Sequence, residues 1–185
     1  RSPQITYQQK LATGLTLSLS AIHQSDSKSM GPIAPPNESS SSYLRNGLLP
    51  NINANLQLVS GSFTLGGSVD YKSLRPRLFT TSITNPTERY KTSERIKSFS
   101  SMAYAKYQSQ KITIKAKGII GQNLTEHLLL GGYAVSTLDN ATGKETYTPT
   151  NHLFLFGNII YGKVVQIGIF YGYAKNLGTT DNFVS

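Results

Sequence analysis

The first long segment of the chain alternates between apolar and polar residues with a period of two. Between residues 6 and 21 the odd positions are mainly apolar and include Leu15, Leu17 and Leu19, whereas the even positions are polar or small. A period of two places successive side chains on opposite faces and is typical of a β-strand with two unlike faces. We therefore predict one strand over about 5–23, roughly twice the usual length of five or six residues.

The same alternation recurs further along the chain. Three pairs of alternating segments are joined by short connections, which predict β-hairpins. These short connections lie at 60–62, 108–110 and 162–164. The long connections are rich in Pro, Ser, Asn, Thr and Gly, and they lie at about 25–50, 74–94 and 122–149. After the first strand, the predicted strands cover about 51–59, 63–73, 95–107, 111–121, 152–161 and 165–176.

Long strands joined alternately by short and long connections predict an all-β fold, an antiparallel transmembrane β-barrel. Such barrels have short turns at one rim and long loops at the other. Backbone groups in hydrocarbon must pair within the protein, and only helices and closed barrels achieve this. No apolar run approaches the roughly 18 residues of a membrane helix. A soluble β-sandwich would alternate in the same way, but it does not explain the strand length or the loop asymmetry.

Eight aromatic residues fall on the predicted outward faces. Those assigned to the short-turn rim are Tyr7, Phe63, Tyr107 and Tyr161, and those assigned to the long-loop rim are Tyr71, Phe99, Tyr171 and Tyr173. From Phe63 to Tyr71, at about 3.3 Å per residue and a tilt near 40°, the height is roughly 20 Å. Membrane barrels have an apolar band about 25 Å tall between two aromatic girdles. We therefore predict that these eight side chains form a lipid-facing girdle.

The predicted strand count is odd, whereas bacterial single-chain barrels normally have an even number of strands. The chain also begins without the charged and apolar regions of a targeting signal. We therefore expect residues 1–185 to be a single transmembrane β-barrel segment, and an incomplete piece of a larger barrel.

The chain is basic, with 18 Lys and Arg residues against nine Asp and Glu residues and a net charge of +9. The inward phase of the strands predicts a set of pore-lining charges: Lys10, Asp70, Lys72, Lys106, Lys111, Lys115 and Lys117. Fixed positive charge on a pore wall favours anions, although charged residues are also common on any wetted wall. Further basic residues lie in the long connections, where they either keep the loops soluble or pair with lipopolysaccharide phosphates: Arg75, Arg77, Arg89, Lys91 and Arg95.

The last two predicted strands depart from the polar pattern of the inward face. They place Phe154, Phe156 and Phe170 inside, with Gly168 and Gly172 as their neighbours. An apolar patch on an inner wall indicates a cover, which would be a folded-in loop or a plug domain. The alternative is that the phase of these strands differs from the one assigned here.

The sequence offers no set of residues for catalysis. The histidines at 23, 127 and 152 are separated by loops, no Ser–His–acid spacing is present, and there is no cysteine. We therefore predict no enzyme activity, no cofactor and no metal site. Nucleic-acid binding needs aromatic side chains among the basic ones, whereas here the aromatic residues fall on the opposite face. We predict no nucleic-acid partner.

Two stretches, GIIGQNLTEHLLLGGYAVS at 118–136 and GIFYGYAKNLGT at 168–179, resemble a known family. They are similar to porin-type barrels of Bacteroidetes outer membranes, the DcaP-like trimeric porins. The resemblance implies roughly sixteen strands per pore, a homotrimer, an inward-folded loop at a charged constriction and no catalytic residues. It also implies passive diffusion of small hydrophilic solutes across the outer membrane of a Gram-negative bacterium.

Together with the predicted basic lumen, the resemblance leads us to expect a porin that prefers anionic solutes, in contact with outer-membrane lipid and lipopolysaccharide. One alternative is the barrel of an energy-coupled, TonB-dependent type of transporter, which would carry an N-terminal plug. The other is an accessory barrel in a surface nutrient-uptake complex.

Overall fold

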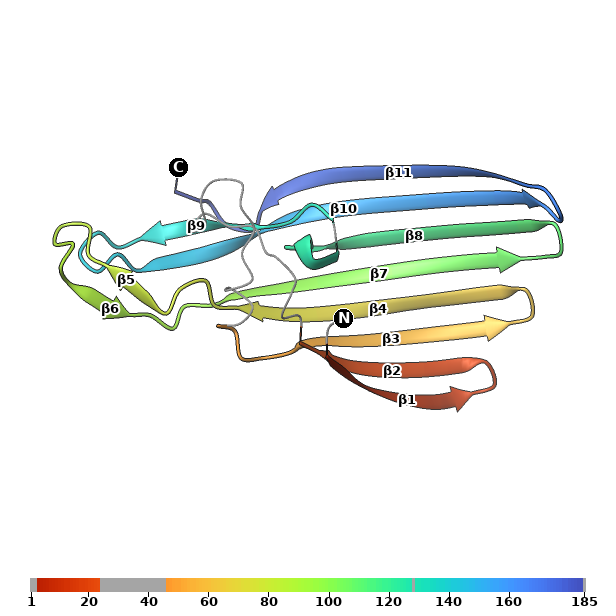
Figure 1. Ribbon diagram of the computed structural model, residues 1–185, viewed down its shortest axis with the longest axis horizontal. Coiled ribbons are helices and arrows are strands. Elements are labelled where there is room, and N and C mark those ends of the chain that lie inside the picture. Colours follow the sequence, from red (N-terminus) through yellow and green to blue (C-terminus); the bar gives the residue numbers. More distant parts are fainter. Residues whose placement is uncertain (1–2, 24–45, 128, 185) are drawn as a thin grey trace.

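The chain forms an open antiparallel β-sheet. The structure is a computed structural model that describes residues 3–23, 46–127 and 129–184. Nine strands form one sheet in the order β1-β2-β3-β4-β7-β8-β10-β11, with β9 paired to β10 (Figure 1). The eight strands of this path are β1 (Gln4–Ala12), β2 (Leu15–Ile22), β3 (Asn51–Ser60), β4 (Phe63–Leu74), β7 (Ile96–Gln108), β8 (Ile112–Gln122), β10 (Glu145–Gly162) and β11 (Gln166–Thr179).

The long connections contain structure of their own. Within the predicted loop at 74–94, β5 (Phe79–Thr81) and β6 (Arg89–Lys91) form a separate two-stranded sheet. The predicted loop at 122–149 contains a short 3-10 helix, η1 (Thr125–His127), and β9 (Tyr133–Leu138). The same segment also supplies the first residues of β10, which extend the sheet beyond the predicted strand end and pair with β9. Most of the predicted loop at 25–50 lies outside the described residues.

The prediction of one strand over 5–23 is wrong, because this segment is a hairpin. β1 and β2 are joined by Thr13 and Gly14. Gly14 has a φ of 76°, and a Cβ atom there would lie 2.1 Å from the carbonyl oxygen of Val59, so this turn requires glycine. Tyr7 pairs with Leu19 across the hairpin, odd residue with odd residue. The register shifts between Lys10 and Ala12, and this irregularity keeps the residues before it paired odd with odd and even with even across the hairpin. The alternation therefore does not reveal the turn.

The register keeps the two faces of the sheet separate across all eight strands. One row of paired residues contains only polar residues and glycine: Thr6, Ser20, Asn53, Asp70, Ser100, Gly121, His152 and Asn176. A row on the opposite face contains Leu15, Leu58, Leu65, Ala105, Ala116, Gly157 and Tyr171. The predicted assignment of residues to two unlike faces is thus present in the paired strands.

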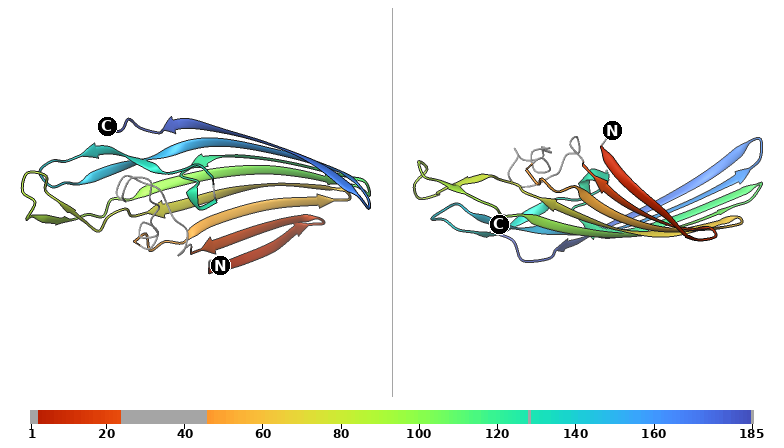
Figure 2. Two further views of the ribbon diagram at one scale, coloured as in Figure 1. Left: turned by 45° about the horizontal axis from the view of Figure 1, so that its top comes forward. Right: turned by 90° about the horizontal axis from the view of Figure 1, so that it is seen from below.

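The sheet is strongly curved and does not close on itself (Figure 2). η1 lies on the concave side, and the adjoining Leu124 packs against Ile119 and Phe154, so the face of those two residues is the concave one. The polar row is on this concave face. The apolar row lies on the convex face, where large side chains are open to solvent, among them Ile169 at 72% exposure.

Candidate functional site

Three lysines gather on the concave face, and we call them the basic cluster: Lys106 of β7, and Lys115 and Lys117 of β8. Lys106 lies directly opposite Lys115 in the antiparallel register. Such opposed residues have Cβ atoms about 4.5–5.5 Å apart, and like charges at that separation are destabilising. Within the described part of the chain, none of the three ammonium groups forms an ion pair or hydrogen bond. The cluster is therefore compatible only with a hydrated surface.

The structure places two other predicted lysines away from the basic cluster. Lys10 lies on the concave face of β1, opposite Thr16, with three strands between β1 and β7. Lys111 precedes β8, although the predicted strand began at 111. It lies in the short turn after β7, where its carbonyl oxygen accepts a hydrogen bond from the Gly162 amide at 2.8 Å. Its charge is therefore at the end of the sheet rather than on the strand wall.

Lys72 was predicted to line the pore and face water, but it is buried in the structure. It lies on the concave face of β4 with 2% of its surface exposed. Its ammonium donates a hydrogen bond to the backbone carbonyl of Asn123, in the connection that follows β8. A buried charge needs such partners, because desolvating it without them is costly. Nearby, the half-buried Asp70 accepts a hydrogen bond from the Asn53 side chain at 3.4 Å.

The connection after β8, here called the β8–β9 connection and described for residues 123–127 and 129–132, folds onto the concave face. Its ends are tied together, because the Gly132 amide donates to the Asn123 side-chain oxygen at 3.0 Å. They are also tied to β10, because the Asn123 amide donates to the Thr150 carbonyl and the Thr150 hydroxyl donates to the Gly132 carbonyl. Asn123 has a φ of 46°, a conformation that asparagine adopts more readily than most residues.

The β8–β9 connection covers part of the apolar patch on the inner wall. Leu124 and Leu129 pack with Ile119 and Phe154, and Phe154 retains only 3% exposure. The sequence predicted either a folded-in loop or a plug domain over these phenylalanines. The folded-in loop is confirmed for Phe154, since Leu124 and Leu129 pack on it. Burial under two leucines is favourable, because it removes the apolar ring from water.

A cavity of about 460 Å³ lies between the β8–β9 connection and the sheet. Its apolar lining residues are Met102, Ile119, Leu129 and Phe156. The rest of its lining combines a cation, a carboxylate, an amide and hydroxyl groups. The polar lining residues are Asn53, Ser68, Asp70, Ser100, Lys117 and His127. The cavity therefore joins the basic cluster to the folded connection.

Two aromatic pairs lie at opposite ends of the convex face. Phe63 and Tyr107 are near the short turns, with ring centroids 4.9 Å apart, and Tyr71 and Phe99 are near the long connections, at 5.0 Å. Both pairs are cross-strand neighbours of β4 and β7. Tyr161 is the penultimate residue of β10, just before the short connection to β11, and it is also exposed on this face. These five residues occupy the ends of the sheet that the sequence predicted.

The other three predicted girdle residues lie elsewhere along their strands. Tyr7 is on the half of β1 that lies toward the long connections, because the chain reverses at Gly14 and brings Tyr7 opposite Leu19. Tyr171 and Tyr173 fall in the middle of β11, since this strand continues to Thr179 rather than ending near residue 176. All three remain on the convex face.

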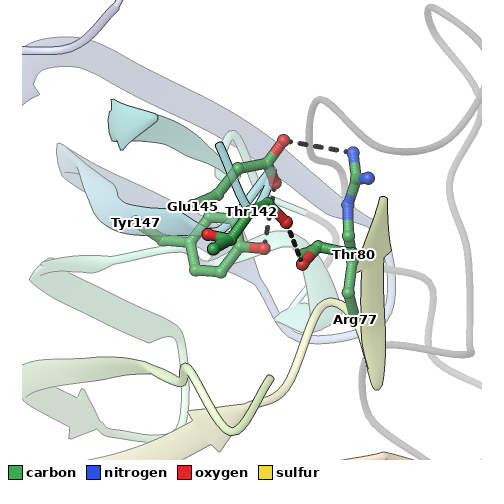
Figure 3. Close-up of polar contacts among 5 residues, drawn as sticks. All are labelled: Arg77, Thr80, Thr142, Glu145 and Tyr147. Carbon is green, nitrogen blue, oxygen red and sulfur yellow. Dashed lines mark hydrogen bonds and ion pairs between the residues drawn. The ribbon is translucent and has the colours of Figure 1, made fainter. Parts of the chain in front are cut away.

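Charged side chains bind the long connections to one another (Figure 3). Arg77 forms an ion pair with Glu145 at 3.2 Å, and Glu145 also accepts a hydrogen bond from the Tyr147 hydroxyl at 3.0 Å. The Thr80 hydroxyl donates to the Thr142 carbonyl at 2.9 Å. Burial raises the pKa of Tyr147, and the charge of Glu145 raises it further. The phenol therefore stays a hydrogen-bond donor in this contact.

Arg75, Arg89 and Arg95, the other arginines predicted for the long connections, also have partners. Arg75 donates to the Thr92 carbonyl, and Arg95 donates to the Gly47 carbonyl at 2.6 Å. The guanidinium carbon of Arg89 lies 5.0 Å from the centre of the Phe79 ring. The sequence interpreted these residues as solubilising or as lipopolysaccharide contacts. The structure adds a third role, because their side chains hold neighbouring segments in place.

One residue of the concave face was missed by the sequence. The Tyr104 ring lies over Gly66 of the adjacent strand, where a Cβ atom would be 2.3 Å from the tyrosine Cζ atom. The Tyr104 hydroxyl reaches the side-chain oxygen of Asn55 at 3.5 Å. A tyrosine and a glycine 38 positions apart give no local signal, so this pair becomes visible only once the register is known.

In the ranges that the structure describes, no three His, Cys, Asp or Glu residues lie together as a metal site would require. Those ranges also contain no helix with the length and apolar character needed to cross a membrane. The chain matches no protein-family model, no curated protein and no solved structure.

Proposed function

We propose that this chain forms part of the wall of an outer-membrane porin that lets small hydrophilic, preferentially anionic solutes diffuse through a basic-lined lumen. The observation that carries the proposal is the continuous separation of faces across eight paired strands. The convex face presents aliphatic and aromatic side chains, and the concave face presents polar groups and the basic cluster. An exposed apolar surface of this extent calls for an apolar environment.

The edges of the sheet fit the same proposal. β1 and β11 are edge strands, and the sheet does not close within the described residues. Unpaired backbone groups are costly in hydrocarbon, so membrane insertion requires further strands that complete a barrel. We propose that these strands belong to the same porin, with lipid around the barrel, lipopolysaccharide near the long connections and a homotrimer as the assembly.

The anionic preference rests on Lys106, Lys115 and Lys117. Rings of lysine or arginine charge bias a pore toward anions. Since these three ammonium groups have no acidic partner in the described structure, their charge acts on whatever passes along the concave face. The effect decreases as salt rises, because the Debye length falls from about 30 Å at 0.01 M to about 3 Å at 1 M.

The test uses the full-length protein in planar lipid bilayers under a salt gradient. We expect a reversal potential that indicates anion preference, and a shift toward cations when Lys106 and Lys115 are both replaced by glutamate. The matched control carries the same charge change at Lys144 and Lys163, which lie in turns away from the cluster. An identical shift in both double variants, or conducting channels without anion preference, would contradict the proposal.

A further inference from the structure

A line of aromatic rings runs along the concave face from under the β8–β9 connection into the open part of the sheet. His152, Phe154, Phe156 and Phe170 follow one another with ring centroids 6.0, 6.4 and 6.2 Å apart. The first two rings are buried, whereas Phe156 is half-buried and Phe170 is 65% exposed. Phe156 also lines the cavity, so the line of rings ends in a flat apolar surface that a solute can reach.

The basic cluster lies beside these two rings. Phe156 of β10 is directly opposite Lys117 of β8, and the next pair on this face joins Asn158 to Lys115. On the other side, Phe156 is opposite Gly172. A Cβ atom on Gly172 would lie 3.3 Å from the Phe170 ring, so the missing side chain leaves room for that ring next to Phe156. An apolar surface and a positive charge are thus immediate neighbours.

The far side of the cavity has a different chemistry. Asn53 of β3, Ser68 and Asp70 of β4 and Ser100 of β7 line it with amide, hydroxyl and carboxylate groups. β7 separates β4 from β8, so the groups of β3 and β4 lie across β7 from Lys117, with Ser100 on β7 itself. Hydroxyl and carboxylate oxygens are acceptors for the hydroxyl groups of a ligand. The Asn53 amide nitrogen donates to the Val69 carbonyl and to Asp70, so Asn53 contributes its side-chain oxygen as an acceptor.

From these three surfaces we infer that the cavity is a recognition site for an acidic monosaccharide. The carboxylate of the sugar is bound by Lys117 through a charge-assisted hydrogen bond. The apolar C–H face of the sugar ring lies on Phe156, and its hydroxyl groups face Ser68 of β4 across the cavity. The inference rests on the proposed function and deepens it, since it names the solute class that the basic concave face selects.

The alternatives use only part of this lining. A neutral sugar leaves Lys117 without a ligand anion. A flat aromatic acid occupies the phenylalanine surface and the lysine, but it has no hydroxyl groups and makes no hydrogen bond to the polar part of the lining. The volume of about 460 Å³ is within the range of small-molecule sites, about 300–1,000 Å³.

The experiment measures solute-induced block of the current through the full-length protein in planar bilayers. The probes are glucuronate, glucose and benzoate, which represent the acidic sugar, the same sugar without charge, and a flat anion without hydroxyl groups. We expect glucuronate to block at a concentration about tenfold lower than either of the others, because glucose lacks the charge-assisted hydrogen bond to Lys117 and benzoate lacks the hydrogen bonds of the hydroxyl groups.

Two variants separate recognition from general effects on the channel. Lys117→Gln removes the charge while it retains a polar side chain, and Phe156→Leu removes the flat ring while it retains an apolar side chain. In Lys117→Gln we expect the tenfold preference over glucose to be lost, because the two sugars differ only in the carboxylate that Lys117 binds. In Phe156→Leu we expect block by both sugars to weaken, because both lie on the ring, with the preference over glucose retained. Potassium chloride conductance should be retained in both variants as the sign of a folded channel. Lys163→Gln, in the short turn before β11, is the matched control and should retain the preference.

The possible failures are distinguishable. Channels that prefer chloride over potassium but are blocked equally by glucuronate and glucose, or equally by glucuronate and benzoate, overturn this inference and leave the proposed function intact. Retention of the preference in Lys117→Gln also overturns it. Absence of any channel from the full-length protein overturns the proposed function, and this inference with it.

Discussion

The ammonium group of Lys72 on β4 is hydrogen-bonded to the backbone carbonyl of Asn123, although 51 residues separate them in the chain. The contact joins the wall of the sheet to the connection that folds across its concave face. Lys72 is almost completely buried, so its role is to hold the β8–β9 connection in place rather than to present charge to solvent.

Replacement of Lys72 by methionine should weaken the attachment of the β8–β9 connection. The Asn123 carbonyl is buried and would lose a charged donor, which costs about 1–3 kcal/mol. We expect a lower free energy of unfolding in urea and faster proteolysis near residues 123–132. Lys10→Met, at an exposed lysine on the same face, should change stability by about 0.5 kcal/mol or less. Equal effects of the two substitutions would show that Lys72 does not anchor the connection.

Gly66→Ala should destabilise the sheet, because the new Cβ atom would overlap the Tyr104 ring. Displacing a packed ring costs about 1–3 kcal/mol. The control is Gly157→Ala, since a Cβ atom there meets no atom within 4 Å. Tyr104→Ala removes the ring, so in the double variant Gly66→Ala/Tyr104→Ala the overlap is relieved. The losses of unfolding free energy in urea should therefore be smaller in the double variant than the sum of the two single losses. Additive losses would contradict the close packing of this pair.

Arginine substitutions should distinguish the two faces of β2 after insertion into lipid vesicles. Leu17 pairs with Leu56 on the convex face, and Thr16 pairs with Gln57 on the concave face. Leu17→Arg should cost about 2–4 kcal/mol if the residue lies near the membrane midplane, whereas Thr16→Arg should be tolerated because its side chain faces water. Unfolding free energies in urea measure the difference. Similar losses at both positions would argue against lipid contact by the convex face.

The turn between β9 and β10 should lose stability in acid. The hydrogen bond from the Thr142 hydroxyl, followed by that from the Ala141 amide, lowers the pKa of Asp139. A carboxylate with a lowered pKa stabilises the folded turn above its unfolded pKa, and this contribution is lost as pH falls through the folded pKa. The measurement is amide hydrogen exchange at residues 139–144, corrected for the intrinsic pH dependence of the exchange rate. We expect protection from exchange in this turn to decrease as pH falls.

Asp139→Asn provides the matched comparison for that turn, because it retains an oxygen acceptor but cannot titrate. Its exchange should vary less with pH than that of the unmodified turn. If both proteins show the same corrected pH profile, the titration of Asp139 does not control the stability of this turn.

Local alternation was sufficient to assign residues to faces. Lys106, Lys115 and Lys117 lie together on the concave face as the pattern predicted, and Phe63 and Tyr107 are neighbours near the short turns on the convex face. The physical reason is that a strand turns its side chains alternately to its two sides, whatever its neighbours are. Antiparallel pairing then aligns residues of the same face across the whole sheet.

The sequence determined the faces of the strands, whereas only the tertiary structure decided where the strands end and what covers them. Thr13 and Gly14 connect two strands without interrupting the alternation, so the pattern could not reveal the turn that reverses the chain. The alternation at Lys72 predicts a polar wall, but its burial depends on a connection 51 residues away. Face assignment is local chemistry, whereas coverage of a face depends on contacts between distant segments, and these form only when the sheet has assembled.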